Sequence, residues 1–123
     1  MNKREVVIRN CFNSWLNQDL SMFLACFSDD IHYIESYGPA YQGKKQIESW
    51  FLDWNKSGQV LVWDIKQLLS IDNTIVCEWY FKCDVKGVIA DFDGISIIEF
   101  NQDDKIVYLK EFKSDIPNRY PYG

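Results

Sequence analysis

The sequence predicts an α+β fold in a single domain spanning residues 1–123. Two observations carry this prediction. Segments in the first half place apolar residues at helical spacing, with one strand between the second and third segments. Long segments rich in β-branched and aromatic residues follow, separated by polar or glycine turns, as in an antiparallel meander. This order predicts three N-terminal helices packed on a curved antiparallel or mixed sheet.

The first two helices are predicted from apolar stripes. One helix is expected from Lys3 to Asn17, with a stripe formed by Ile8, Phe12, Trp15 and Leu16. A shorter helix follows Asp19, whose side chain suits an N-cap. Its apolar residues recur at helical spacing as far as Phe27, and the polar run from Ser28 to Asp30 ends it.

A strand, a loop and a third helix complete the first half. Residues Ile31 to Ser36 alternate as a strand, and a loop from Tyr37 to Ala40 follows and is closed by Gly43. The third helix is expected from Lys44 to Lys56, with an apolar face formed by Ile47, Trp50, Phe51 and Trp54. Gly58, just past its end, is a C-cap signal.

The second half is predicted to consist of strands joined by tight turns. The expected strands are Gln59 to Ile71, Thr74 to Lys86, Val88 to Phe100 and Lys105 to Ile116. The turn signals between them are Asp72-Asn73, Gly87 and the polar run Asn101 to Asp104.

Composition limits the partners. The chain carries 13 Lys and Arg against 18 Asp and Glu, a net charge of −5. Nucleic acids and anionic membranes both attract basic surfaces, so we expect neither as a partner. No stretch approaches the roughly 20 apolar residues of a membrane span. Glu5, Arg9 and Asn10 interrupt any signal-peptide core, so we expect a cytoplasmic protein.

Metal, cofactor and disulfide chemistry is not expected. Cys77 and Cys83 lie roughly 20 Å apart on one predicted strand, too far for a disulfide. We therefore predict free buried thiols in a reducing compartment at Cys11, Cys26, Cys77 and Cys83. With one histidine, His32, a zinc or di-iron site is not expected. The segment Asp91 to Gly94 lacks the remaining ligands of a calcium loop, and we interpret it as a strand with a closely packed glycine.

The order of elements carries a family resemblance. A helix, a short helix, Phe27-Ser28-Asp29-Asp30, a strand, a loop with Gly43, a helix with Ile47 and four long strands resemble the nuclear transport factor two fold. The segments Phe92 to Ser96 and Lys105 to Phe112 resemble its SnoaL-like branch, which includes the ketosteroid isomerases. The resemblance implies a cone-shaped scaffold, on which isomerases, cyclases, hydrolases, dehydratases and plain binding modules are all built.

The resemblance also implies which side chains face the cone. Alignment on the isomerase pattern at Asp29-Asp30 places Glu35 where those enzymes carry a general-base carboxylate. Strand alternation then points a set of residues inward: Ile31, Tyr33, Cys77, Trp79, Phe81, Cys83, Phe92, Gly94, Ser96, Ile98, Leu109 and Glu111. Trp63 and Ile65 are assigned inward on size alone. The expected ligand-binding residues are Trp15, Trp50, Trp54, Trp63, Trp79, Phe81 and Ser96. The alternative is that these rings fill a solid core.

Two acids map into this apolar surround. Burial without a partner raises the pKa of a carboxyl group, which makes it usable as an acid or base near neutral pH. If the protein is an enzyme, we expect Glu35 to be the base, Glu111 the second acid or orienting group, and Tyr33 a hydrogen-bond donor. The alternatives are a salt bridge from Glu111 to a neighbouring lysine, and solvent exposure of Glu35.

Departures from the family pattern narrow the range of activities that we expect. The ketosteroid isomerases carry a tyrosine donor at the position of Cys11 and an aspartate at that of Ser96, and neither residue here donates as strongly. The epoxide-hydrolase branch uses an Asp-Arg-Asp set, and no arginine falls in a predicted strand. The dehydratase branch uses two histidines. We therefore expect a protein that binds a small, apolar or carbonyl-bearing molecule, with cofactor-independent isomerase- or cyclase-type chemistry if catalytic. The alternative is a non-catalytic ligand-binding or assembly module.

The outward face of the sheet predicts an assembly. Alternation places many large apolar residues there beside a few charges: Val76, Tyr80, Ile95, Ile97, Tyr108 and Phe112, with Glu78, Lys82 and Lys110. Such a face exceeds what a soluble monomer usually exposes, so we expect a homodimer that pairs through the sheet. His32 maps to the same face. The alternative is that the alternation is inverted and these residues form the core.

Overall fold

The computed structural model describes residues 2–123 as three helices and six strands. The helices are α1 (Lys3–Asn17), α2 (Leu20–Ala25) and α3 (Lys44–Ser57). The strands are β1 (Phe27–Ile34), β2 (Ala40–Gln42), β3 (Gly58–Ile71), β4 (Thr74–Val85), β5 (Val88–Phe100) and β6 (Ile106–Ser114). The predicted α+β class with three helices is thus confirmed. The four long strands also lie where the sequence predicts them, within two residues at each end.

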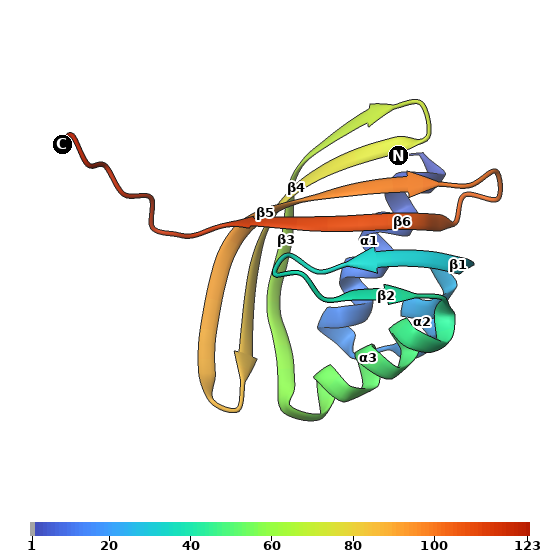
Figure 1. Cartoon of the computed structure of the whole chain (residues 1–123), viewed down its shortest axis with the longest axis horizontal. Coiled ribbons are helices and arrows are strands. Elements are labelled where there is room, and N and C mark those ends of the chain that lie inside the picture. Colours follow the sequence, from blue (N-terminus) through green and yellow to red (C-terminus); the bar gives the residue numbers. More distant parts are fainter. Residues whose placement is uncertain (1) are drawn as a thin grey trace.

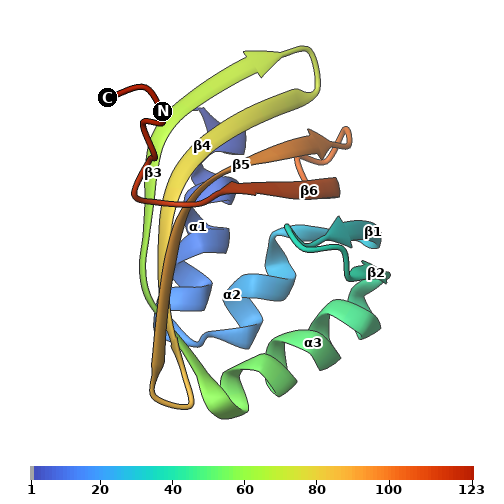
Figure 2. The same cartoon turned by 60° about the vertical axis from the view of Figure 1, so that its left-hand side comes forward.

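The strands form one mixed sheet in the order β2-β1-β6-β5-β4-β3. The predicted meander from β3 to β6 is antiparallel throughout, whereas β1 pairs with β6 in parallel. The long strands curve around the three helices, which all lie on the same side of the sheet (Figures 1 and 2). Helix α1 packs on β3, and α3 packs on β1 and β2, so the helices enclose a space against the concave face.

Local capping explains where the first two helices begin. The Asn2 side chain accepts the Glu5 N–H at 2.8 Å, and α1 ends at Asn17, followed by the C-cap Gln18 in a left-handed conformation. The Asp19 carboxylate accepts the Met22 N–H at 3.0 Å, which confirms the predicted N-cap of α2. The apolar stripe of α1 faces the sheet, and Ile8, Phe12 and Trp15 are buried.

The boundary between α2 and β1 corrects the sequence prediction. Helix α2 ends at Ala25, and Phe27 begins β1 opposite Ile106 of β6. The ring of Phe27 still packs against Phe23, with centroids 4.9 Å apart. The apolar spacing therefore reflects contact across a turn, because the two rings share the core even though Phe27 has left the helix. Strand β1 accordingly starts four residues before the predicted Ile31 and ends at Ile34.

The segment after β1 holds a strand that was predicted as loop. Strand β2 pairs antiparallel with β1 in the register His32 to Gln42, and the Glu35 N–H donates to the Pro39 carbonyl at 2.8 Å to close the turn. Three residues are too few for strand alternation to be visible in the sequence. The turn matters for the site, because it carries Glu35 and Tyr37 to the cavity.

Two glycines are required by tryptophan rings. Gly58 is the C-cap of α3, as predicted, and its N–H donates to the Trp54 carbonyl, but its backbone is extended with φ −120° and not left-handed. A Cβ there would approach the Trp54 ring to 2.9 Å, which explains the glycine by packing instead. Gly94 confirms the predicted close approach, since a Cβ would overlap the ring of Trp79 from the adjacent strand.

The alternation of the strands is as predicted. Ile31, Cys77, Trp79 and Ile98 face the helices and are at most 1% exposed. The outward face keeps partly exposed apolar residues, among them Ile95 at 40% and Phe112 at 44%. The inverted alternation is therefore excluded. All four cysteines are buried free thiols. Among residues 2–123, no helix is both long enough and apolar enough to cross a bilayer.

Candidate functional site

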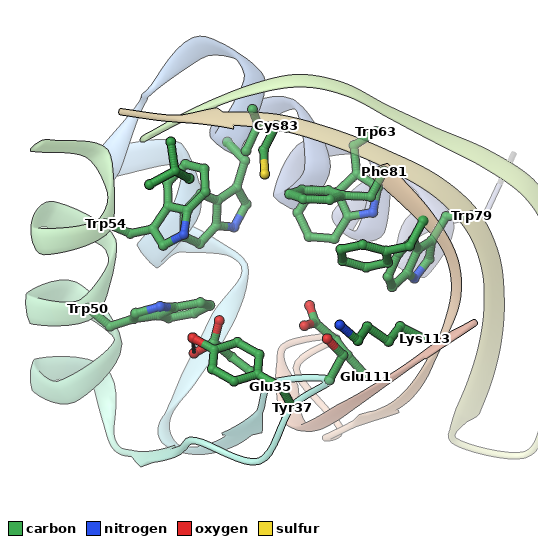
Figure 3. A pocket seen from close by; sticks show the side chains of 15 residues that line it. Glu35, Tyr37, Trp50, Trp54, Trp63, Trp79, Phe81, Cys83, Glu111 and Lys113 are labelled. Atoms are coloured by element: carbon green, nitrogen blue, oxygen red, sulfur yellow. Dashed lines mark hydrogen bonds between the residues drawn. The ribbon is translucent and has the colours of Figure 1, made fainter. Parts of the chain in front are cut away.

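A cavity of about 250 Å³ lies between the helices and the concave face of the sheet (Figure 3). Its apolar wall consists of Trp15, Trp50, Trp54, Val60, Trp63, Trp79, Phe81, Cys83, Val85 and Phe92. Its polar wall consists of Glu35, Ser36, Tyr37, Glu111 and Lys113. The exposed side chains of Tyr37 and Lys113 mark the mouth. The space is small beside the roughly 300–1,000 Å³ of typical ligand pockets, so it suits a small guest.

The aromatic wall is assembled from two helices and the sheet. Trp15 comes from α1, Trp54 from α3, and Trp63 and Phe81 from the neighbouring strands β3 and β4. Trp15 and Trp54 meet at 88° with centroids 5.5 Å apart, and Trp63 and Phe81 meet at 79° and 5.1 Å. Edge-to-face contacts of this kind are favourable for aromatic pairs. They also hold neighbouring rings nearly perpendicular to each other.

Glu111 is the most perturbed acid of the cavity. It projects from β6, and its Oε2 accepts the hydroxyl hydrogen of Tyr33 from β1 at 2.5 Å. The pKa of Glu111 is raised to about 7, because burial, with a smaller contribution from the charge of Glu35, outweighs the hydrogen bonds from Tyr33 and the Ser36 backbone, which lower it. The carboxyl group is therefore present in both protonation states near neutral pH, as acid/base chemistry requires.

Glu35 lies in the turn after β1 and is 8% exposed. Its Oε2 accepts hydrogen bonds from Tyr41 at 2.6 Å and from Tyr37 at 3.3 Å. Burial raises the pKa of Glu35 above its usual value, and the two phenol donors partly oppose this rise. The alternative of a solvent-exposed Glu35 is therefore excluded. Among the described residues neither glutamate has an ion-pair partner, which also removes the alternative of a Glu111 salt bridge to lysine.

Most residues predicted for ligand contact meet at this cavity. Six rings line it, namely Trp15, Trp50, Trp54, Trp63, Trp79 and Phe81, together with Glu35 and Glu111. Ser96 does not line it: this fully buried hydroxyl accepts the Trp79 Nε1–H at 2.9 Å and so orients that ring. Tyr33 lies behind the wall and holds Glu111. Cys11 is also behind the wall, so no donor stands where the isomerase tyrosine would be.

Four polar residues of the site were not predicted from the sequence. Ser36, which the alternation pointed outward, lines the cavity, Tyr37 and Tyr41 both donate to Glu35, and Lys113 lies at the mouth. The two tyrosines approach Glu35 because the β1–β2 turn folds back, and the missed strand β2 was the signal that could have located them. Lys113 continues the alternation of Leu109 and Glu111 along β6, so the same parity would have placed it inward.

Two indole N–H groups in the wall have no hydrogen-bond partner among residues 2–123. They belong to Trp15 and Trp63, and both nitrogen atoms are fully buried. An unsatisfied buried donor costs about 1–3 kcal/mol, which the packing of the rings must offset. Trp63 achieves this in part by stacking on Phe12, with centroids 4.1 Å apart. Within residues 2–123 no cluster of three His, Cys, Asp or Glu side chains is placed to hold a metal ion.

The sequence matches one family over most of its length. A family model described as a SnoaL-like domain matches residues 8–109. The chain belongs to the SnoaL-like domain family. The resemblance inferred from the sequence is thus confirmed. The matched range of this SnoaL-like protein runs from α1 into β6 and contains Glu35, whereas Glu111 lies just beyond its end.

Solved structures share the fold of this SnoaL-like protein. An epoxide hydrolase of the LEH-like type from M. tuberculosis has a TM-score of 0.81 at 13% identity, covering 90% of this chain and 82% of that chain. A putative polyketide cyclase from Xanthomonas campestris has a TM-score of 0.78 at 15% identity, covering 90% of each chain.

A third structure is a hypothetical protein from Catenulispora acidiphila with a ketosteroid isomerase-like fold, in complex with trimethylamine. Its TM-score is 0.78 at 14% identity, covering 88% of this chain and 85% of that chain. At such identities the likeness shows a shared fold, and activity must be argued from the site. No curated protein matches the sequence.

Proposed function

We propose that this SnoaL-like protein binds a small, largely apolar organic molecule in its aromatic cavity and moves a proton on it with Glu111. One observation carries the proposal: a carboxyl group whose pKa lies at about 7 faces an apolar cavity. A base with a pKa near the working pH can take up a proton and return it, as a cofactor-independent isomerase or cyclase must do. The fold shared with a putative polyketide cyclase is consistent with this.

The residue roles follow from the hydrogen bonds. Ionised Glu111 takes a proton from a carbon next to a carbonyl group, the electron pair moves to the carbonyl oxygen, and Glu111 then returns the proton. Tyr33 holds the carboxylate in place from behind the wall. Glu35 is the second carboxyl group, and its two phenol donors keep it less free to react than Glu111. The proposed base is therefore Glu111, whereas the alignment on the isomerase pattern pointed to Glu35.

The size of the cavity limits the guest. A space of about 250 Å³ accommodates one small ring or a short branched chain. The Catenulispora acidiphila protein of the same fold is in complex with trimethylamine, a molecule of this small class. We therefore take a small ketone as the first substrate to test.

The test is hydrogen–deuterium exchange of cyclohexanone in D₂O, followed by proton NMR. We expect the protein to accelerate exchange of the protons next to the carbonyl group, with a rate that rises as the pH passes about 7. Glu111→Gln should abolish the acceleration because an amide cannot accept the proton. Glu99→Gln, at an exposed position of β5, is the matched control and should exchange as the wild type does. Equal rates for wild type and Glu111→Gln would contradict the proposal.

A non-catalytic binding or assembly module is the second candidate. Two observations favour it. Neither Cys11 nor Ser96 offers a donor to the cavity, so an oxyanion would find little stabilisation there. In addition, the outward face of the sheet exposes Ile95 and Phe112 side by side on β5 and β6. That pair supports a homodimer through the sheet.

A further inference from the structure

The cavity combines a group of aromatic rings with acidic groups on one side. The rings, which we call the aromatic box, are those of Trp54, Trp63, Trp79 and Phe81. The carboxylates of Glu35 and Glu111 lie across the space from Trp54, Trp63 and Phe81 (Figure 3). Trp63 and Trp79 meet at 83° with centroids 5.6 Å apart, so rings face the space from more than one direction. A neutral apolar guest would use the rings, but it would leave the two carboxyl groups without an ion-pair partner among the described residues.

The charge around the cavity is also unbalanced. Its wall contains two acidic side chains and one basic side chain, Lys113, which is exposed at the mouth. Neither glutamate forms an ion pair with a residue of the described chain. The whole sequence carries a net charge of −5. Such a site attracts cations and repels anions.

One ammonium group of the protein already occupies an aromatic face at the rim. The Nζ of Lys113 lies 5.3 Å from the centroid of Phe92, within the range of a cation–π contact. Phe92 packs against Phe81 at 5.2 Å, so the face that holds this ammonium is continuous with the box. The negative faces of the rings are therefore within reach of an ammonium group that enters the cavity.

We infer that the guest is a small organic ammonium ion whose alkylated nitrogen lies in the aromatic box and pairs with Glu111 and Glu35. This inference rests on the proposed function, because it takes the same cavity as the ligand site. Alkyl groups on nitrogen satisfy the apolar wall, while the positive charge satisfies both the ring faces and the carboxylates. No neutral guest of the same shape does both, so charge is the feature that the site selects.

The pairing predicts a pH dependence. Six titratable groups lie near Glu111: Tyr33 on β1, Glu35 and Tyr37 in the turn after β1, Tyr41 on β2, Cys11 on α1 and Lys113 on β6. Burial raises the pKa values of the three tyrosines above their usual value of 10, and a hydrogen bond with Cys26 together with burial raises that of Cys11, so all four stay protonated. The carboxyl groups are thus the groups that titrate in acid to neutral solution. Binding of a permanent cation should strengthen as the pH rises through about 7, because Glu111 then ionises.

The experiment compares two probes of the same shape by isothermal titration calorimetry. Choline carries a quaternary ammonium group, and 3,3-dimethylbutan-1-ol replaces its nitrogen by carbon. We expect choline to bind at least about tenfold more tightly than the alcohol at alkaline pH. That preference should shrink at acid pH, where Glu111 is protonated. Equal affinity of the two probes, or no binding of choline, would overturn the inference.

Variants separate charge from shape. Glu111→Gln should weaken choline binding about tenfold and leave the alcohol unaffected. Phe81→Leu keeps an apolar wall but removes a ring face, and it should likewise weaken choline alone. The control is Phe112→Leu on the outward face, which should bind both probes as the wild type does. Loss of both probes in Phe81→Leu would show that the ring acts by shape and would overturn the inference.

The ketone exchange assay distinguishes this inference from the proposed function. If cyclohexanone exchange depends on Glu111 while choline and its neutral analogue bind equally, the proposed function stands and the ammonium inference fails. If choline binds selectively while no ketone exchange is catalysed, the ammonium inference stands and proton transfer fails.

Discussion

Glu111 owes its chemistry to its surroundings rather than to its type. The same side chain on a surface strand would titrate near its usual value of 4.5, whereas in this cavity burial raises its pKa to about 7. The Glu111 carboxylate accepts one short hydrogen bond, from Tyr33, and too few others to offset the hydration that it loses on burial. The residue is therefore costly to the fold when ionised, and that cost is measurable as a pH dependence of stability.

We predict that the free energy of unfolding falls as the pH rises from about 4.5 to about 7. A carboxyl group whose folded-state pKa is raised binds more protons in the folded state than in the unfolded state across this range, so stability decreases with pH. The loss is on the order of 2–3 kcal/mol. Urea unfolding at several pH values measures it.

Glu111→Gln should remove most of this slope, with a smaller part remaining from Glu35, whose pKa is also raised. Glu99→Gln serves as the control and should keep the full slope. A wild-type protein whose stability rises between about pH 4.5 and 7 would contradict the assignment of Glu111 as a desolvated acid.

At the scale of elements, strand β5 fixes the orientation of the Trp79 ring in the cavity wall. Gly94 leaves room for the Trp79 ring, and Ser96, two residues further on, accepts its indole hydrogen. The two residues face Trp79 because β4 and β5 pair in a register that sets Gly94 opposite Trp79. A strand with a glycine and a serine at alternate inward positions thus holds one large ring in a single orientation.

We predict that Gly94→Ala destabilises the protein by about 1–3 kcal/mol, because the added methyl group overlaps the Trp79 ring. The ring must move toward the cavity, so the affinity for a guest should fall as well. Urea unfolding and ligand titration measure the two effects. Ser96→Ala is the comparison, since it removes the hydrogen bond without adding volume. Unchanged stability in Gly94→Ala would show that Trp79 has another position available.

For the whole molecule, the two faces of the sheet have different roles. The concave face and the helices enclose the cavity, while the outward face exposes a cross-strand pair, Ile95 and Phe112. His32 and Tyr108 pack edge to face on the same side, with centroids 5.8 Å apart. A second copy of the chain would cover this surface in a two-fold arrangement.

We predict a dimer in solution, measured by light scattering at micromolar concentration. Ile95→Glu should separate it, because an unpaired charge buried in an interface costs several kcal/mol. Ile89→Glu makes the same change at another exposed position of β5, near the β4–β5 turn, and should remain dimeric. A wild-type mass near 14.6 kDa would refute the dimer. A dimeric Ile95→Glu would place the interface elsewhere.

The sequence alone determined the class, most element boundaries and the face of each long strand. Helical spacing is a local property, and it predicted Trp54 on the apolar face of the third helix. The family resemblance set the inward phase of the alternation at Phe81, and Trp63 was assigned inward on size alone. The approach of Tyr37 and Tyr41 to Glu35 could not be predicted from the sequence, because β2 is too short to show the alternation of a strand. The end of α2 was misplaced for a related reason, since Phe27 packs on Phe23 from a strand.

Only the tertiary structure decided which groups meet. Tyr33 and Glu111 lie 78 positions apart in the sequence, and they bond because β1 pairs in parallel with β6, a neighbour relation that local patterns do not encode. The same holds for the volume of the cavity. Inward-facing rings are equally compatible with a filled core, and the space remains because α1, α3 and the curved sheet hold their rings at steep angles around it. The pKa of Glu111 follows from that enclosure, since desolvation depends on everything packed around a group and not on its neighbours in the chain.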